Sequence, residues 1–275
     1  MNFFRALHLK FLNVLPDKDF FNRLLETIMS ELLHLTDIVY AYPESREPIL
    51  DGLNFELGPD RRIGVIGPNG RGKTTFLHLC VGLLRPDSGE IAFKGRSLEW
   101  RERDLLELRK SMGLVFQNPD DQLFCPTVLE DVAFGPLNLG FRRDEAADRA
   151  RWALQLVDMP GYENRVTHKL SGGEKKTLSL ATILAMQPEA ILLDEPSTGL
   201  DPDSREHIVR VLNELPQSLV IVSHDWDFLA RTTSELYTLD HGCLQETDQG
   251  ALHKHIHYHP SGEVPHVHQS GLAGR

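Results

Sequence analysis

The stretch that decides the fold is RRIGVIGPNGRGKTT, residues 61–75. Its first half, RRIGVIG, is an apolar run without alternation, as expected of a parallel strand that is buried on both faces. Its second half, GPNGRGKTT, matches the pattern G-x-x-x-x-G-K-[ST], and a helical pattern follows from Lys73 to Leu84. A strand, a glycine-rich loop and a helix in this order can bind nucleotide phosphates, because backbone N–H groups and the positive end of the helix face the anion.

Residues 67–75, which we call the phosphate loop, have separate expected roles. Lys73 should reach the β- and γ-phosphates, and Thr74 should bind Mg²⁺. The other residues expected to surround the nucleotide are Gly67, Pro68, Asn69, Gly70, Arg71, Gly72 and Thr75. The alternative is a glycine-rich turn with an incidental lysine, and the order of strand, loop and helix argues against it.

A second apolar run, ILLDE at residues 191–195, ends in two acidic residues. We expect Asp194 to bind Mg²⁺, directly or through water. Glu195 suits a general base that orients the attacking water. The alternative is a pair of strand-end carboxylates with a capping role, which the presence of the phosphate loop makes the weaker interpretation.

The composition limits the class of protein. The chain has 275 residues, of which 41% are hydrophobic and 25% charged, as is usual for a soluble globular protein. Its net charge of -11 argues against a nucleic-acid partner. Three cysteines, Cys80, Cys125 and Cys243, lie too far apart to suggest a disulfide framework or a zinc site. No apolar run approaches the ~20 residues that span a bilayer, so a membrane role would come through a partner.

Three parts separate along the chain. Residues 1–30 form an N-terminal extension, residues 31–247 alternate apolar runs with helical patterns, and residues 248–275 are a histidine-rich tail expected to be flexible. The pattern of the central part predicts an α/β domain with a mainly parallel sheet. Two alternating runs, at residues 32–42 and 49–57, predict an antiparallel β-subdomain ahead of it. Between about 118 and 170 the buried-strand pattern stops, which predicts a helical insert.

The segment LSGGEKK, residues 170–176, resembles the signature motif of ATP-binding cassette (ABC) proteins. Other marks of that family follow in order: Tyr42 resembles the aromatic residue that stacks on adenine, Gln117 the glutamine of the Q-loop, STGLD at 197–201 the D-loop with Asp201, and His224 the switch histidine. The resemblance covers residues 32–247. It implies a P-loop NTPase fold of the ABC type that hydrolyses ATP with Mg²⁺, and it implies that Gln117 contacts Mg²⁺ or its water.

In that family two cassettes face each other head to tail. The resemblance therefore implies that Ser171, Gly172 and Gly173 bind the γ-phosphate of an ATP held by the other subunit. The dimer could be a homodimer or a heterodimer, and one complete set of motifs makes the homodimer the default. Two positions depart from the family pattern: Arg71 replaces a small residue, and Thr177 stands where an arginine is usual.

The run FQNPDDQLF, residues 116–124, and the sequence that follows it to Gly140 resemble ATPases of energy-coupling-factor importers, in particular the cobalt/nickel branch. The resemblance implies two kinds of partner, a transmembrane coupling subunit and a substrate-binding membrane subunit. It places the chain peripherally on the cytoplasmic face of the cell membrane. Asp120, Asp121 and Gln122 would contact a helix of the partner.

Three alternatives stay open at this point. Residues 116–124 could be a solvated acidic loop, the importer could carry a vitamin, or the chain could be a soluble ABC ATPase that works on nucleic acid or ribosomes. The acidic net charge and the absence of a long coiled-coil insertion argue against the last.

The two ends of the chain carry weaker signals. The tail contains His253, His255, His257, His259, His266 and His268, whose imidazoles could bind Ni²⁺ or Co²⁺. The alternative is an uncommitted tail or an expression artefact. At the other end, five apolar side chains between Phe20 and Ile28 fall on one helical face and could dock on a membrane partner or on lipid. Translation from Met29 is the alternative there.

Overall fold

The computed structural model describes residues 31–45 and 47–247, which contain two β-sheets. The smaller sheet is antiparallel, with strand order β2-β1-β4-β5. The larger has the order β10-β9-β3-β8-β7-β6, and only β10 runs antiparallel to its neighbour. The strands are β1 (Leu33–Tyr40), β2 (Leu50–Leu57), β3 (Arg62–Ile66), β4 (Ser88–Phe93), β5 (Arg96–Ser97), β6 (Met112–Val115), β7 (Ala190–Asp194), β8 (Ser218–Val222), β9 (Glu235–Asp240) and β10 (Cys243–Glu246).

The α-helices of the described residues are α3 (Lys73–Cys80), α4 (Glu102–Ser111), α5 (Val128–Asn138), α6 (Arg143–Leu156), α7 (Gly172–Leu184), α8 (Pro202–Glu214) and α9 (Trp226–Thr232). Two short 3₁₀-helices, η1 (Pro119–Asp121) and η2 (Thr167–Lys169), flank the α5–α6 region. Helix α3 ends four residues before the predicted Leu84, and Gly82 follows with a φ of 66° that a helix cannot continue.

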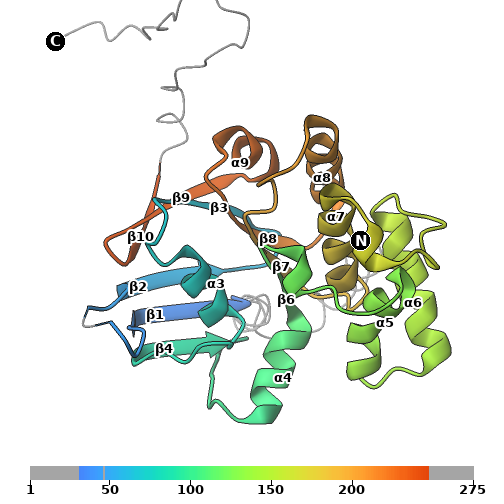
Figure 1. Cartoon of the computed structure of the whole chain (residues 1–275). Coiled ribbons are helices and arrows are strands. Elements are labelled where there is room, and N and C mark those ends of the chain that lie inside the picture. The colour runs from blue at the N-terminus through green and yellow to red at the C-terminus, as the bar shows by residue number, and fades with distance from the viewer. Residues whose placement is uncertain (1–30, 46, 248–275) are drawn as a thin grey trace, which may run out of the picture.

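The larger sheet is buried on both faces, which explains its unbroken apolar strands. In β8, Leu219 and Ile221 join the core on one side, while Val220 and Val222 join the core on the other. Helix α3 lies between the two sheets, where Phe76 packs edge-on against Phe55 of β2 at a centroid distance of 4.9 Å. Helices α7 and α8 cover the opposite face, so the molecule is layered (Figure 1).

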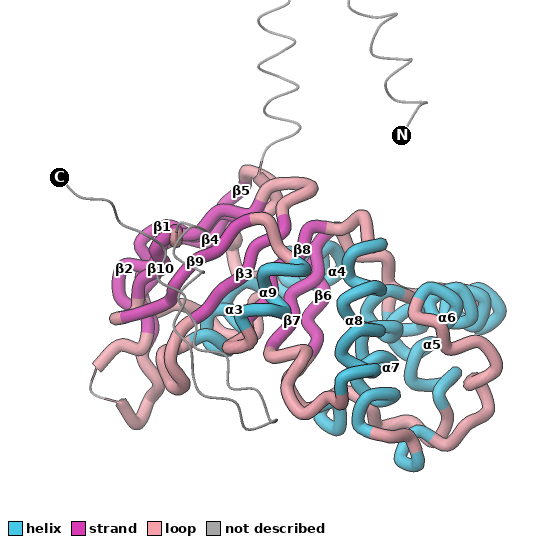
Figure 2. Tube along the Cα trace, turned by 90° about the horizontal axis from the view of Figure 1, so that it is seen from above, coloured by secondary structure: helices cyan, strands magenta, loops and turns pink. Residues whose placement is uncertain are grey.

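The region with α5 and α6 lies at the end of the molecule away from the smaller sheet, beside α7 (Figure 2). Helix α5 begins with a capping box, in which Thr127 and Glu130 satisfy each other's backbone N–H groups. The buried carboxylate of Asp131 accepts hydrogen bonds from the backbone N–H groups of Phe124 and Cys125 and from Thr167 Oγ1. It therefore joins the loop before α5 to η2.

The predicted fold class, an α/β cassette with an antiparallel β-subdomain and a helical insert, is confirmed. The boundaries proposed for the insert, about 118 and 170, stay a prediction. The extension and the histidine-rich tail lie outside the described residues. Within the described ranges, no helix has the length and apolarity needed to cross a membrane.

The parallel strands place four loops at one edge of the larger sheet. Strands β3, β6, β7 and β8 run in the same direction, so the residues that follow their carboxyl ends gather there. These are the phosphate loop, Gln117, Glu195 and His224. Ligands of open α/β sheets bind at this edge.

Candidate active site

A pocket of about 400 Å³ opens at this edge of the larger sheet. It is lined by Tyr42, Ile49, Asn69, Gly70, Gly72, Lys73, Thr74, Thr75, Gln117, Asp194 and Glu195. Residues predicted from three separate motifs, at positions 67–75, 117 and 194–195, thus meet in one place. The volume lies in the range usual for small-molecule sites.

The phosphate loop curls around the Lys73 side chain. Its ammonium donates hydrogen bonds to the backbone oxygens of Gly67 (2.8 Å) and Pro68 (3.0 Å), and the residue is 7% exposed. Gly72, which precedes α3, has a φ of 94°, and a Cβ there would lie 2.9 Å from Leu50 Cδ2. Only glycine fits this position, and the start of α3 has no side-chain cap, which suits an anion at its first turn.

Oxygen donors suited to Mg²⁺ stand beside the loop. Thr74 Oγ1 donates a hydrogen bond of 2.6 Å to Asp194 Oδ2, and Gln117 lines the same pocket. Hydroxyl, carboxylate and amide oxygens are the donor types that this hard cation takes, so the residues fit it. Burial raises the pKa of the Asp194 carboxyl, while the bond from Thr74 lowers it. The pKa of Asp194 is raised overall, because burial and the neighbouring Glu195 outweigh the bond from Thr74 and the nearby Lys73.

Glu195 lies directly after β7 and is 6% exposed. Its Oε2 lies 2.7 Å from His224 Nδ1 and accepts a bond of 3.0 Å from Thr198 Oγ1. Its backbone has a φ of 47°, the left-handed region that non-glycine residues rarely adopt. The fold thus holds one buried carboxylate in a strained turn, pointed at the histidine that follows β8.

Tyr42 and Arg71 stand at the rim. Tyr42 is 40% exposed, and its hydroxyl lies 2.9 Å from Thr75 Oγ1, so the ring faces the pocket mouth. Arg71 points away: its Nε lies 3.7 Å from Asp240 Oδ1 at the end of β9. The Arg71 side chain therefore does not enter the phosphate loop, whose interior is lined by backbone groups.

The LSGGEKK segment starts α7 and does not line the pocket. Ser171 is the N-cap: its Oγ accepts from the Glu174 N–H, and the Glu174 carboxylate accepts from the Ser171 N–H at 2.8 Å. The two glycines differ. A Cβ on Gly173 would lie 2.3 Å from Ser204 Oγ of α8, whereas nothing lies within 4 Å of one on Gly172. Gly173 is needed for packing, and Gly172 presents an open backbone.

Asp201 lies beside this helix end rather than in the pocket. It caps α8 through the N–H groups of Asp203 and Ser204, and Ser204 Oγ donates to its Oδ2 at 2.6 Å. These hydrogen bonds lower the pKa of Asp201. The predicted site residues therefore form two groups, one around the pocket and one around the start of α7.

Comparisons with known proteins agree with this geometry. The family model described as ABC transporter matches residues 50–198, more than half of the chain. The chain belongs to the ABC transporter family. A relative from Methanothermobacter thermautotrophicus, the energy-coupling factor transporter ATP-binding protein EcfA, is 47% identical over 217 residues, covering 78% of this chain and 69% of the relative.

Two solved structures match at a TM-score of 0.71. One is cbiO1 from Clostridium perfringens, part of the ABC transporter complex cbiONQ, with 32% identity and coverage of 78% of this chain and 87% of that one. The other is the dimeric ATP-binding cassette MJ0796 in a post-hydrolysis state with ADP and Pi, with 27% identity and coverage of 78% and 97%. This chain is accordingly an ATP-hydrolysing ABC ATPase.

In this ABC ATPase the FQNPDDQLF loop is tied to α7. Lys175 Nζ lies 2.6 Å from Asp120 Oδ1. Gln122 donates to Ser179 O (2.8 Å) and Thr182 Oγ1 (2.7 Å) and accepts from the Phe116 N–H. The Gln122 amide is thus used within the chain, and its contact with a partner stays a prediction. Asp120 and Asp121 are exposed.

Three residues around Glu195 were missed by sequence reasoning. Thr198 and Ser223 place hydroxyls near its carboxylate, and Lys176 donates to its backbone oxygen at 2.9 Å. Thr198 lies within STGLD and Ser223 directly precedes His224, which is the only sequence signal for these two. Lys176 is the last residue of LSGGEKK, but that motif gave no sign of a bond to the backbone of Glu195.

Proposed function

We propose that this ABC ATPase is the ATP-hydrolysing subunit of an importer of the energy-coupling factor type, which takes up cobalt or nickel ions through separate membrane subunits. The observation that carries the ATPase chemistry is the buried Glu195 carboxylate, held by His224 in the pocket that also contains Lys73 and Thr74. The similarity to EcfA and cbiO1 supports the type of importer.

Each side chain of the pocket has a distinct role in hydrolysis. The phosphate loop and the Lys73 ammonium bind the β- and γ-phosphates, and Tyr42 at the rim faces the adenine. Thr74, Asp194 and Gln117 would hold Mg²⁺, which when bound neutralises phosphate charge. Glu195 accepts a proton from the attacking water. Because a carboxylate only accepts hydrogen bonds, His224 donates through Nδ1 and orients it.

The second half of the site comes from another copy or a related cassette. Ser171 Oγ accepts from the Glu174 N–H and its hydroxyl also lies against the Glu174 carboxylate, so it would turn its proton from that carboxylate to the phosphate of the facing nucleotide. Gly172 adds an open backbone at the start of α7. The dimeric state of MJ0796 with ADP and Pi supports this arrangement.

The partner in the membrane would dock beside α5. Phe124 is 63% exposed and Phe134 42%, and their rings meet edge-on at 4.8 Å. Asp120 and Asp121 lie in the same loop as Phe124. An apolar pair next to carboxylates suits an amphipathic helix of the transmembrane coupling subunit, which would hold this subunit at the cytoplasmic face of the membrane.

Cobalt or nickel as cargo rests on the FQNPDDQLF resemblance and on the six tail histidines. The tail lies outside the described residues, so its role in metal binding is a proposal from composition alone.

The test uses the whole transporter. The complex is purified from membranes with the wild-type subunit, with Asp120→Ala/Asp121→Ala, and with Asp144→Ala/Asp148→Ala on α6 as control. We expect the first variant to lose membrane partners and ⁵⁷Co²⁺ or ⁶³Ni²⁺ uptake while keeping basal ATPase activity, and the control to keep all three. If the first variant still co-purifies with the membrane subunits and still takes up metal, the proposal that residues 116–124 dock on the membrane partner is rejected. If the wild-type complex takes up a vitamin and no metal, the proposal that cobalt or nickel is the cargo is rejected.

A further inference from the structure

We propose that Lys176 of α7 is a positioning residue that holds the turn carrying Glu195, so that hydrolysis depends on a contact between the signature helix and the backbone of Glu195 in the same chain. The inference rests on the role proposed for Glu195. It concerns a residue outside the pocket, since Lys176 does not line it.

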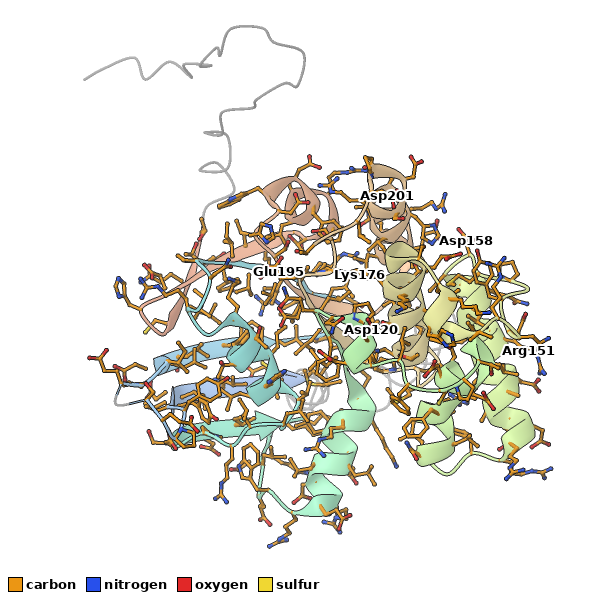
Figure 3. All side chains as sticks on the ribbon, in the orientation of Figure 1. Asp120, Arg151, Asp158, Lys176, Glu195 and Asp201 are labelled. Atoms are coloured by element: carbon orange, nitrogen blue, oxygen red, sulfur yellow. The ribbon has the colours of Figure 1, made fainter. Side chains whose placement is uncertain are left out.

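The contact is direct. Lys176 Nζ donates to Glu195 O at 2.9 Å and to Pro196 O at 3.3 Å. Figure 3 shows the two labelled residues facing each other from α7 and from the end of β7. Two consecutive carbonyl groups thus share one ammonium, which fixes the direction of the peptide units on both sides of Pro196.

The turn needs such support. With its φ of 47°, Glu195 adopts a backbone conformation that costs free energy and persists only where neighbours enforce it. The Thr198 N–H closes the turn on Glu195 O at 3.2 Å, and the Glu195 N–H is fixed to Val222 O at 2.8 Å. Lys176 is the donor that approaches from α7. Removing it leaves two inward-facing carbonyls without their charged donor, so the turn can rotate and carry the carboxylate away from His224.

The lysine stem occupies a defined place. It lines a small cavity together with Phe116, Ser179 and Pro196, and burial lowers the pKa of the Lys176 ammonium while Glu195 and Asp194 raise it. The space beside the stem means that methionine, of similar length, can replace it without a clash. Loss of the two hydrogen bonds can therefore be separated from loss of packing.

The position of Lys176 also links two half-sites. Five residues earlier on the same helix, Ser171 caps α7 and is proposed to meet the nucleotide of a second copy. A continuous helix moves as one body, so displacement of its start is passed to Glu195 through Lys176.

The experiment compares purified full-length Lys176→Met, Lys176→Gln and Lys176→Arg with the wild type. Lys94→Met, which removes a surface lysine paired with Glu189, is the control. We expect Met and Gln to lower kcat by about 10- to 100-fold, as a displaced catalytic group does, with the ATP dissociation constant unchanged. Arginine, which can still donate to both carbonyls, should restore part of kcat. The ATP-dependent dimer should form in all variants.

Glu195→Gln is measured in parallel, so that two failures can be told apart. If Glu195→Gln is inactive and both neutral Lys176 variants keep the wild-type kcat, the positioning role is overturned and the base assignment stands. If Glu195→Gln stays active, the base assignment itself fails. Equal losses of kcat and ATP affinity, together with a lowered Tm, would show that Lys176 has only a structural role and would overturn the proposal. If Lys176→Met does not fold, the result for Lys176→Gln decides.

Discussion

Lys73 and Thr74 are neighbours in the sequence, but the first turn of α3 directs them to different partners. Lys73 turns back to the carbonyls of the phosphate loop, whereas Thr74 reaches across to Asp194 of β7. The first turn of α3 thus carries, at adjacent positions, the group proposed to bind phosphate and the group proposed to bind the metal. The division of roles depends on Gly72, whose conformation lets the helix start there.

At this scale we predict that Lys73→Ala weakens ATP binding. The change removes one charge-assisted contact to phosphate, worth about 1.5–3 kcal/mol, or roughly 10- to 100-fold in the dissociation constant. Titration with a fluorescent ATP analogue measures it, with Lys94→Ala as control. Unchanged affinity in Lys73→Ala would place the phosphates elsewhere.

Helix α7 connects more of the site than any other element described. Its first residues bear the signature, Lys175 pairs with Asp120, Lys176 holds the Glu195 turn, and Ser179 and Thr182 bind Gln122. Residues 116–124 and the turn at Glu195 therefore contact the same helix. Movement imposed on residues 116–124 by a partner would reach Glu195 through this helix.

For the start of α7 we predict that Ser171→Arg separates nucleotide binding from dimer formation. The variant should bind ATP as a monomer with normal affinity, because Ser171 does not line the pocket. It should not form an ATP-dependent dimer, since arginine places bulk where the hydroxyl would meet a phosphate. Size-exclusion chromatography with ATP measures the dimer; a loss of affinity equal to that of Lys73→Ala would argue against a composite site.

Helices α8 and α9 are joined by an ion pair, for which we predict a pH-dependent loss of stability. Arg205 binds Asp225 at 2.9 and 3.1 Å. Burial raises the pKa of Asp225, but the bonds from Arg205 and the Phe228 N–H outweigh it, so the pKa lies below its ordinary value. Stability from this carboxylate is full above the unfolded pKa of ~3.9 and is lost as pH falls through the folded one.

Arg205→Met should therefore lower the free energy of unfolding at pH 7 by about 1 kcal/mol, or roughly 2–4 °C in Tm. The difference from wild type should shrink as the pH falls below ~3.9. Thermal melts of both proteins at pH 7 and at a pH below ~3.9 measure this difference in Tm, with Arg103→Met, at an exposed position, as control. Arg205 also binds Asp227 at 2.7 Å, so a difference that does not change with pH would mean that neither carboxylate stabilises the fold through Arg205.

The sequence predicted the groups expected to act on the nucleotide and missed those that support Glu195, whether through its carboxylate, as Thr198 does, or through its backbone, as Lys176 does. Lys73, Thr74, Asp194 and Glu195 stand in spaced motifs after apolar strands, so position and role could be inferred together. Gln122 was assigned to a partner because an exposed-looking polar loop gives no sign of an amide that turns inward. The strands β9 and β10 and the helices α4 and α9 were not predicted, and β10 and α9 are too short, at four and seven residues, to show a clear period.

On the scale of the whole molecule, one sheet edge collects the pocket and a separate helix end collects the signature. Within the described residues these two groups do not meet, and Asp201 and Gly173 pack together beside α8 instead. A chain built this way holds two incomplete halves. In the proposed head-to-tail dimer each half would be completed by the other chain, which would explain why one sequence contains all the motifs.

The ends of the chain lead to a prediction about metal. Removal of residues 248–275 should abolish binding of Ni²⁺ and leave ATP hydrolysis unchanged, because the nucleotide motifs end at His224. Imidazole must be unprotonated to bind metal, so affinity should fade as pH falls through ~6.5. Calorimetric titration of full-length and shortened protein tests this; identical heats would remove the tail from metal binding.

The most direct test of the account is the ATP turnover and assembly of Glu195→Gln. The amide keeps the shape of the site but cannot accept the proton, so kcat should fall by about 10²- to 10⁴-fold while ATP still binds. ATP should then trap a stable dimer, seen by size-exclusion chromatography with light scattering. Glu189→Gln, at the other end of the same strand, should behave as wild type. Near-normal turnover by Glu195→Gln, or a monomer with bound ATP, would contradict the account.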